Sequence, residues 1–397
     1  MKHPFTISLF ILLCVLSLPV WAQPKYPFPQ AGKRTYFGSH LTTPQDEQNK
    51  IVTTYYDHWK ETYLTESKKV PGDFKVVMNK KGWTVSEGIG FGMLIVVQMA
   101  GHDPKARVYF DGLNRFRKRY PSKINPLFMN WRIKNETHPK ADDCATDGEI
   151  DMATALLMAA EQWNNPAYKK EAIRLIRALS LRLVRKDNSL RLGDWNIEKG
   201  KHEGTRLSDF ATAHFRAFYY ATNDPKWKQV EAKCYAIIHT LQTNYASATG
   251  LVPDFTVRDS KGIWRPAPAG FLEGKNDGYY SYNSCRVPWR IGLSAVYYND
   301  PQAKKIMNRF MKWARLIPPH RFKAGYRLNG QALVQYSDTC FRSPMAVAAM
   351  ATGDQKWLDA QFNTIKATQE NYYSDSLTLL SLLVLTQNYW LPSPASL

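Results

Sequence analysis

A short signal that starts a helix recurs five times along the 397-residue chain and constrains the fold more than any other feature. Each copy places Asp or Asn directly before Pro, or before Gln in the last copy. Such a pair is typical of a helix N-terminus, because the side chain caps free N–H groups and Pro suits the first helical position. The copies recur roughly every 60 residues, the length of two helices with their loops. They are GHDPKARV near Asp103, NNPAYKKEA near Asn165, NDPKWKQVE near Asp224, NDPQAKKIM near Asp300 and GDQKWLDAQ near Asp354.

The segments on the two sides of each signal differ in hydropathy. The segment before it is apolar and rich in small residues, as in DMATALLMAAEQW, and the segment after it is amphipathic, as in YKKEAIRLIRALSLRL. Helices that are apolar all round lie inside a protein, and one-sided helices lie outside. With an opening helix near IVTTYYDHWKETYL and a closing helix near SLTLLSLLVLTQNYW, the sequence predicts about twelve helices in six pairs.

Six hairpins of alternating inner and outer helices can close into an (α/α)6 barrel, and we predict this all-α fold. An open solenoid of the same hairpins is the alternative. No linker rich in Pro, Gly or Ser interrupts the repeat. We therefore expect one domain over residues 25–390 and a short frayed tail at 391–397.

The first 22 residues have the pattern of a secretory signal peptide. Lys2 is followed by an apolar run and by the small-residue cleavage site Val20-Trp21-Ala22. This run is too short for a stable membrane anchor, and no later segment approaches roughly 18 uninterrupted apolar residues. The sequence predicts a secreted protein, extracellular or periplasmic, with no membrane partner.

The chain is strongly basic, with a formal net charge of +19. Its Lys and Arg are scattered along the sequence, which favours a solvated surface over a nucleic-acid footprint, so we expect no nucleic-acid partner. We also expect the protein to be a monomer. Nine His without a ligand spacing such as HExxH predict no metal, and no other cofactor is indicated. The cysteines at 144, 234, 285 and 340 are compatible with zero, one or two disulfides.

Carboxylates stand at the starts of two neighbouring inner helices. Glu87 lies in WTVSEGIGFGM, and Asp147 lies with Glu149 and Asp151 in ATDGEIDMATALL. Both have a structural explanation: acidic groups favour a first helical turn, and Thr84 with Glu87 fits a capping box. If both helix starts lie on one rim, however, the carboxylates converge, and their repulsion in a cleft raises at least one pKa. That setting suits glycoside hydrolysis.

The spacing of Gly88, Gly90 and Gly92 raises a separate question, because Gly-rich turns can bind phosphate. No strand and βαβ unit accompanies these glycines, so phosphate binding is not supported. We predict that they allow close helix packing instead.

WTVSEGIGFGM together with ATDGEIDMATALLMAA resembles glycoside hydrolase family 8, whose members are inverting cellulases, lichenases, chitosanases and xylanases with an (α/α)6 barrel. The similarity continues through MNWRI, LGDWN, LVPDF and YSYNSCRVPWRIG, and so spans most of the chain after residue 22. The resemblance implies a secreted, endo-acting and cofactor-independent hydrolase of β-1,4-linked polysaccharide.

The resemblance also implies roles for individual residues. Glu87 would be the general acid, and Asp147 would hold and help distort the central sugar, whereas Glu149 and Asp151 would keep capping and packing roles. Trp131 and Trp195 would be stacking platforms, although both could be core aromatics. Tyr282 and Arg286 would line the cleft, with Arg286 close to the catalytic water or its base.

The general base is where the sequence departs from part of the family. Many members carry Asp where this chain has Asn283, and an amide cannot accept a proton from water. The chitosanase and lichenase branch has Asn there too and takes its base from a Glu in the preceding loop. By this resemblance Glu273 is the base, with Asp277 as the fallback. Inversion would then require about 6.5–9.5 Å between the carboxyl groups of Glu87 and Glu273.

The substrate is less constrained than the reaction. Chitosan is a polycation and should be repelled by a basic protein, so we expect β-glucan, cellulose or mixed-linkage, ahead of chitosan and xylan. A polysaccharide-binding protein that has lost its catalytic base is the alternative.

Overall fold

The computed structural model describes residues 23–137, 143–196, 203–392 and 394. The signal peptide predicted at residues 1–22 lies outside this part of the chain. The described residues contain twelve α-helices, six inner and six outer. The inner helices are α2 (Ser86–Gln98), α4 (Thr146–Gln162), α6 (Thr212–Thr222), α8 (Val287–Tyr298), α10 (Thr339–Thr352) and α12 (Tyr372–Leu385). The outer helices are α1 (Gln45–Tyr63), α3 (Ala106–Arg119), α5 (Pro166–Arg182), α7 (Lys226–Asn244), α9 (Pro301–Ala314) and α11 (Gln355–Ile365).

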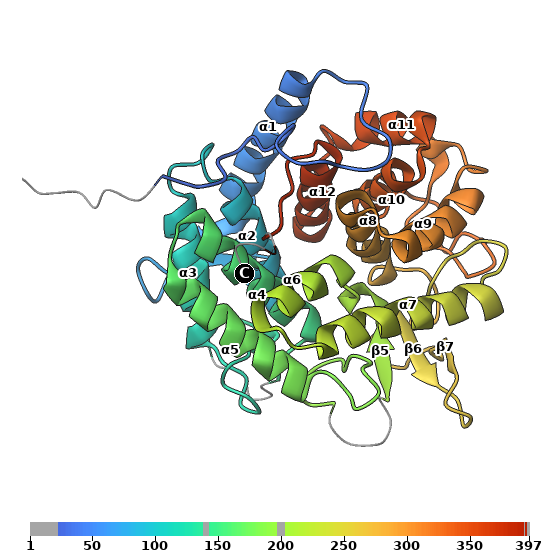
Figure 1. The fold of residues 1–397 in the computed structure, drawn as a ribbon, viewed down its shortest axis with the longest axis horizontal. Helices are drawn as coiled ribbons and strands as arrows, with labels where there is room; N and C mark the ends of the chain where they lie inside the picture. Colours follow the sequence, from blue (N-terminus) through green and yellow to red (C-terminus); the bar gives the residue numbers. More distant parts are fainter. Residues whose placement is uncertain (1–22, 138–142, 197–202, 393, 395–397) are drawn as a thin grey trace, which may run out of the picture.

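The inner helices form a closed ring (Figure 1). Each contacts the next inner helix in chain order, and α12 contacts α2. Each outer helix from α3 to α11 packs against the inner helix before it in the chain, α9 packs also against α10, and α1 packs against α12. The predicted (α/α)6 barrel is therefore confirmed, and the open solenoid is wrong because the ring closes.

Local sequence explains where the outer helices begin. The side chains of Asn165, Asp300 and Asp354 cap α5, α9 and α11 by accepting backbone N–H groups of the first turn. Asp103 and Asp224 lie slightly earlier and each accepts the N–H two residues on, so that they shape the turn before the helix. Each of the five copies of the recurring signal therefore lies at or just before the start of an outer helix.

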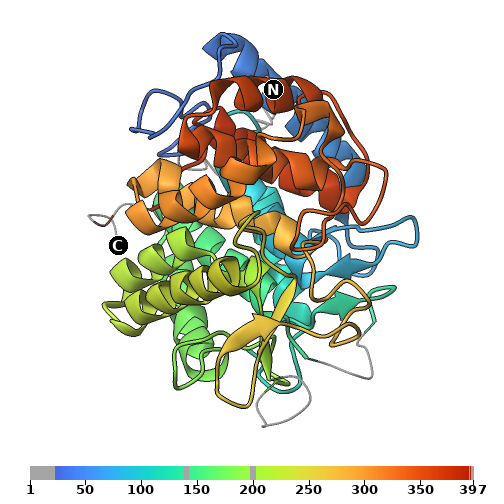
Figure 2. The same cartoon turned by 90° about the vertical axis from the view of Figure 1, so that its right-hand side faces the viewer.

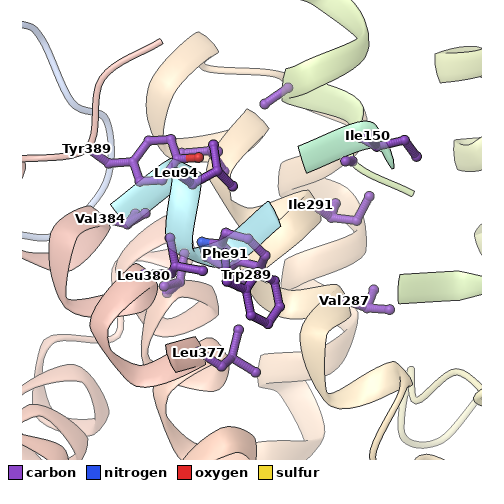
Figure 3. Packing of buried hydrophobic residues seen from close by; sticks show 14 of the residues in the cluster. Phe91, Leu94, Ile150, Val287, Trp289, Ile291, Leu377, Leu380, Val384 and Tyr389 are labelled. Atoms are coloured by element: carbon purple, nitrogen blue, oxygen red, sulfur yellow. The ribbon is translucent and has the colours of Figure 1, made fainter. Parts of the chain in front are cut away.

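The core fills the ring with side chains from several inner helices. Figure 3 shows Phe91 of α2 beside Trp289 of α8 and Leu380 of α12, and Leu94 of α2 beside Tyr389. The rings of Phe91 and Trp289 meet edge to face with centroids 6.1 Å apart, a favourable aromatic geometry. In α2 every residue except Glu87 is buried. Glu87 is therefore the one side chain of this helix that reaches a more open environment.

Glycines allow α2 and α4 to approach closely. A Cβ at Gly90 would lie 2.8 Å from the Cβ of Asp151, and one at Gly148 would lie 2.6 Å from the carbonyl carbon of Ser86. Real side chains do not tolerate such separations. The structure thus confirms the packing role predicted for the glycines of this helix.

Replacing Gly90 with alanine is expected to destabilise the protein by about 1–3 kcal/mol, because overpacking forces two inner helices apart. Gly274 is the control, since a Cβ there meets nothing within 4 Å and its φ is not positive. Its change to alanine should cost less than about 0.5 kcal/mol. Urea unfolding measures both values, and equal midpoints would contradict the expectation.

The segment before α1 closes one end of the barrel. Backbone N–H groups of Phe28, Phe37 and Ser39 donate to the carbonyls of Ala100, Val296 and Met350, which follow or end α2, α8 and α10. The C-terminal ends of the inner helices are thereby covered. One boundary needs correction: Leu391, assigned to the frayed tail, is buried, and its N–H donates to the hydroxyl of Tyr297 at 3.2 Å.

Short strands lie in the loops at the other end of the barrel. They are β1 (Leu64–Glu66) with β2 (Phe74–Val76), β3 (Thr84–Val85) with β4 (Arg132–Ile133), and a sheet of β5 (Gly204–Arg206), β6 (Phe255–Arg258) and β7 (Trp264–Pro266), all antiparallel. Figure 2 shows the β6–β7 hairpin, in gold, outside the helical ring. The four cysteines of the described chain are buried free thiols. No helix of that part is long and apolar enough to cross a membrane.

Candidate active site

A cleft opens at the N-terminal ends of the inner helices. One cavity of about 600 Å³ is lined by Glu87, Asp147, Glu273, Asn283 and Arg286, together with Tyr282. A second cavity of about 420 Å³ is lined by Trp195 and adjoins the first, because Trp131, Arg206 and Glu273 border both. The structure therefore brings all eight predicted site residues into one continuous cleft.

The helix-capping explanation of Glu87 is wrong. Helix α2 begins at Ser86, and no side chain caps it. Thr84 lies on β3, where its hydroxyl donates to the carbonyl of Val76 at 2.6 Å. Glu87 is left free to point into the cleft.

Arg286 stands at the centre of the site. It belongs to the 3₁₀ turn η2 (Ser284–Arg286) before α8, and its side chain is buried. Its guanidinium donates to Glu87 Oε2 at 2.6 Å, to Asp147 Oδ2 at 2.8 Å and to Asn283 Oδ1 at 2.9 Å. One cation therefore fixes three cleft side chains from separate parts of the chain.

The surroundings of Glu87 and Asp147 shift the pKa values of their carboxyl groups in opposite directions. Burial and the nearby charge of Asp147 raise the pKa of Glu87, against the opposing effect of Arg286. Although burial opposes ionisation of Asp147 as well, Arg206 and Arg286 hold the pKa of that carboxyl well below its usual range. The site thus keeps one acid that retains its proton to higher pH and one permanent carboxylate, the division that acid–base chemistry requires.

Glu273 reaches the same cleft from the loop between β7 and α8. Asn283 donates from Nδ2 to Glu273 Oε2 at 2.8 Å, and half of the Glu273 side chain surface is exposed. Hydrogen bonds thus run from Glu87 through Arg286 and Asn283 to Glu273. This exposed fraction leaves Glu273 accessible to water.

Asp277, the fallback candidate for the base, stabilises the backbone of the loop instead. Its buried carboxylate accepts the N–H groups of Leu272, Glu273 and Gly274 at 2.7, 3.1 and 2.9 Å. It does not line the cleft in the described part of the chain. Asp277 shapes the turn that carries Glu273, so the fallback assignment is not supported.

Asp254 of the LVPDF motif binds the backbone at the end of this loop, next to α8. Its Oδ1 accepts the N–H groups of Ser281, Asn283 and Ser284 at 3.0, 3.1 and 2.7 Å. Burial raises the pKa of Asp254 to about 7. Two buried aspartates therefore set the positions of Glu273 and Asn283.

The remaining acids of the second motif are internal. Asp151 pairs with Arg290 of α8, with Oδ2 and Nη2 2.7 Å apart. Glu149 accepts the N–H of Met129 at 2.7 Å, and burial raises the pKa of Glu149 to about 8. Neither residue lines the cleft cavities of the described chain, which agrees with the packing roles expected for them.

Aromatic rings line both cavities of the cleft. Trp131 is 36% exposed, with the guanidinium of Arg132 4.3 Å from its ring centroid, and Tyr282 is 38% exposed. Trp195 is half-buried and packs beside Leu192 and Phe255. Sugar rings stack on such partly exposed faces.

Three further cleft residues were not predicted from the sequence: Arg206, Tyr372 and Tyr373. Arg206 ends β5, directly before the turn η1 (Leu207–Asp209) that leads into α6. It therefore lies in the segment that leads into an inner helix, whereas Glu87 and Asp147 lie in the first turns of theirs, and this partial parallel was the available signal. Tyr372 and Tyr373 begin α12, and Tyr372 reaches Glu87 only because the ring closes.

Replacing Tyr372 with phenylalanine is expected to move the alkaline limb of the kcat/KM profile to higher pH. The hydroxyl donates to Glu87 Oε1 at 2.9 Å and favours the ionised carboxyl, so its loss raises the pKa of Glu87 further. Tyr373→Phe is the matched control, because that hydroxyl donates to the carbonyl of Tyr282 instead. A shift of the limb to lower pH, or an equal shift in both variants, would contradict this account.

The chain matches a family model and several known proteins. The family model of glycosyl hydrolases family 8 matches residues 35–387. A beta-glucanase of Niallia circulans is 37% identical over 96% of this chain and 96% of its own length. An endoglucanase of Bacillus sp. (strain KSM-330) is 34% identical over 93% of this chain and 82% of its own. The apo structure of a beta-1,3-1,4-glucanase from Paenibacillus sp. X4 superposes with a TM-score of 0.89 at 37% identity, covering 93% of this chain and all of that one.

Proposed function

Since this chain belongs to glycosyl hydrolase family 8, and is therefore a glycoside hydrolase of polysaccharide, we propose that it is an endo-acting β-glucanase that inverts the anomeric centre. The observation that carries the proposal is that Arg286 binds both Glu87 and Asp147, while the pKa of Glu87 is raised and the pKa of Asp147 is lowered. It occurs in a cleft that also presents Glu273 and stacking rings.

In the proposed reaction, Glu87 gives its proton to the glycosidic oxygen as the bond from that oxygen to the anomeric carbon breaks. Glu273 takes a proton from a water whose oxygen bonds to the anomeric carbon from the opposite face. Asp147 remains ionised and binds the sugar, where its charge stabilises the oxocarbenium-like transition state. Proton exchange with solvent then restores Glu87 and Glu273.

We assign the base to Glu273 because position 283 carries an amide. Asn283 orients the Glu273 carboxylate through its Nδ2 and contacts Arg286 through its Oδ1. This arrangement supports the branch of the family with Asn at this position and a Glu base in the preceding loop.

β-1,4-linked glucan, cellulose or mixed-linkage, is the proposed substrate. The names of the relatives at 34–37% identity favour glucan. The buried guanidinium groups of Arg206 and Arg286 offset part of the acidic charge of the cleft and so weaken its attraction for the ammonium groups of chitosan. Export remains part of the proposal and depends on residues 1–22.

The test is reducing-end release from barley β-glucan, carboxymethyl cellulose, chitosan and xylan, combined with viscometry and with the anomeric configuration of the first product by NMR. We expect β-glucan or carboxymethyl cellulose to be cut fastest, with viscosity falling early and the α-anomer formed first. Faster cutting of chitosan or xylan would overturn the substrate, and a β-anomer would overturn inversion. No turnover of any polymer would favour a binding protein.

Arg206 is the positioning residue that the proposal adds. Its side chain lies 3.6 Å from Asp147, 3.3 Å from Asp209 and 3.9 Å from Glu273, and it is 11% exposed. Burial raises the pKa of Asp209 to about 7 even beside this cation. Arg206 therefore keeps Asp147 ionised and faces the carboxylate proposed as the base.

Arg206→Met is expected to lower kcat by about 10²-fold and to move the acid limb of the kcat/KM profile to higher pH, because the carboxylates lose a stabilising charge. Arg206→Lys should recover part of both effects. Arg258→Met is the control, since Arg258 lies on the same sheet but pairs with Asp187. A lower melting temperature with an unchanged pH profile would reduce Arg206 to a structural role.

A further inference from the structure

The strong positive charge of this protein has no use in hydrolysing a neutral glucan. Much of it is concentrated on two neighbouring outer helices. Helices α3 and α5 each carry five Lys or Arg and one acidic residue, so together they contribute eight of the nineteen net charges. Figure 1 shows α3 and α5 side by side on the outer wall of the barrel, and hydrogen bonds from Asn114 and Lys118 to Glu171 join them.

A cavity of about 520 Å³ lies between these helices. Four cations line it, Arg117, Lys118, Lys170 and Arg174, and Glu171 is the single acid. Glu171 is already neutralised, since Arg117 binds it with a side chain that is only 4% exposed and Lys118 lies 3.2 Å away. Lys170 and Arg174 are exposed and have no acidic partner among the described residues. The cavity therefore presents uncompensated positive charge.

We propose that this cavity, the α3–α5 pocket, binds an acidic polysaccharide, a polymer of sugar rings that bear carboxylates. Pro126 and Leu127 are exposed and supply apolar surface for the CH faces of a sugar, and the cations line the same cavity. The residues that line the cavity in the described chain include no aromatic side chain, whereas single-stranded nucleic acids bind by stacking on aromatic rings. A concave pocket on a helical wall also fits a chain of single rings better than a duplex.

The pocket is separate from the catalytic cleft but connected to it through the chain. Pro126 and Leu127 belong to the segment that continues through Met129 to Trp131, the aromatic residue shared by both cleft cavities. Anchoring on an acidic matrix would hold the cleft near glucan embedded in it. The inference concerns binding alone and stands whether or not β-glucan is the substrate.

The experiment is affinity electrophoresis of the full chain in native gels that contain polygalacturonate. The pocket variant is Lys170→Glu with Arg174→Glu. The matched control is Lys305→Glu with Lys312→Glu, which makes the same change in net charge at exposed positions of the outer helix α9. Neither pair belongs to the cleft, and an unchanged melting temperature serves as the check that both variants are folded.

We expect the wild type to be retarded, with the dissociation constant raised at least about 10-fold by the pocket pair and less than about 3-fold by the α9 pair. Equal losses in both variants would overturn the pocket, because net charge alone would then explain retention. Tighter binding of a DNA oligonucleotide than of polygalacturonate, with the same loss in the pocket variant, would overturn the assignment to polysaccharide.

Discussion

Replacing Glu87 with glutamine is expected to lower kcat on β-glucan by at least about 10³-fold. Glutamine has the same shape but cannot release a proton to the leaving oxygen, and general acid catalysis contributes roughly 10²–10⁴-fold. The side chain is held by Arg286 and Tyr372 at 2.6 and 2.9 Å, so the amide can keep the same position. The loss should therefore appear in kcat and leave the binding of polysaccharide almost unchanged.

The substrate provides the control for this variant. A cello-oligosaccharide with a dinitrophenolate leaving group needs little protonation, so Glu87→Gln should lose far less activity on it than on β-glucan. Gel retardation on β-glucan and the melting temperature should stay close to those of the wild type. An equal loss on both substrates would show that Glu87 acts in some way other than as the acid.

Most of the fold could be predicted from the sequence because its signals are local. The Asp and Asn residues before five of the six outer helices act within two or three positions, and the apolar composition of α2 and α4 reflects burial on every side. Closure of the ring was less accessible, since the contact between α12 and α2 joins the two ends of the chain and has no local signature.

The site residues also differ in whether a local signal in the sequence marks them. Glu87 and Asp147 could be found because each begins an inner helix, and the family resemblance added Glu273 and Arg286. Tyr372 could not be found, because it is 285 positions from Glu87 in sequence and meets it only through ring closure. Arg206 was missed because its contacts with Asp147 and Glu273 depend on how β5 is placed above α6.

Glu273→Gln is expected to lower kcat on β-glucan by about 10²–10³-fold, since the attacking water loses its base. The sharper variant is Glu273→Ala, which removes the side chain and leaves room for a small anion. Azide should restore turnover of an activated cello-oligosaccharide and yield the α-glycosyl azide, because the anion attacks the face opposite the leaving group. Detection of that product by NMR tests the role and the stereochemistry together.

Asp277→Asn separates a catalytic effect from a positioning effect. It weakens the three N–H contacts that shape the turn around Glu273, so some activity should be lost, but the carboxylate of Glu273 remains and azide should give no rescue. Azide rescue of Asp277→Ala, with none for Glu273→Ala, would reverse the assignment of the base.

A substitution at position 283 provides a further test of Glu273 as the base, because many family members carry Asp there. In Glu273→Ala, a further change of Asn283 to Asp places a carboxylate next to Arg286, which Asn283 now contacts at 2.9 Å. This arginine would keep the new carboxylate ionised and able to accept a proton from water, so part of the lost kcat should return. In the wild-type background the same change sets two carboxylates where Asn283 and Glu273 are 2.8 Å apart. Their repulsion raises at least one pKa of the pair, so the acid limb of the profile should move to higher pH. A base elsewhere in the cleft would leave both experiments without effect.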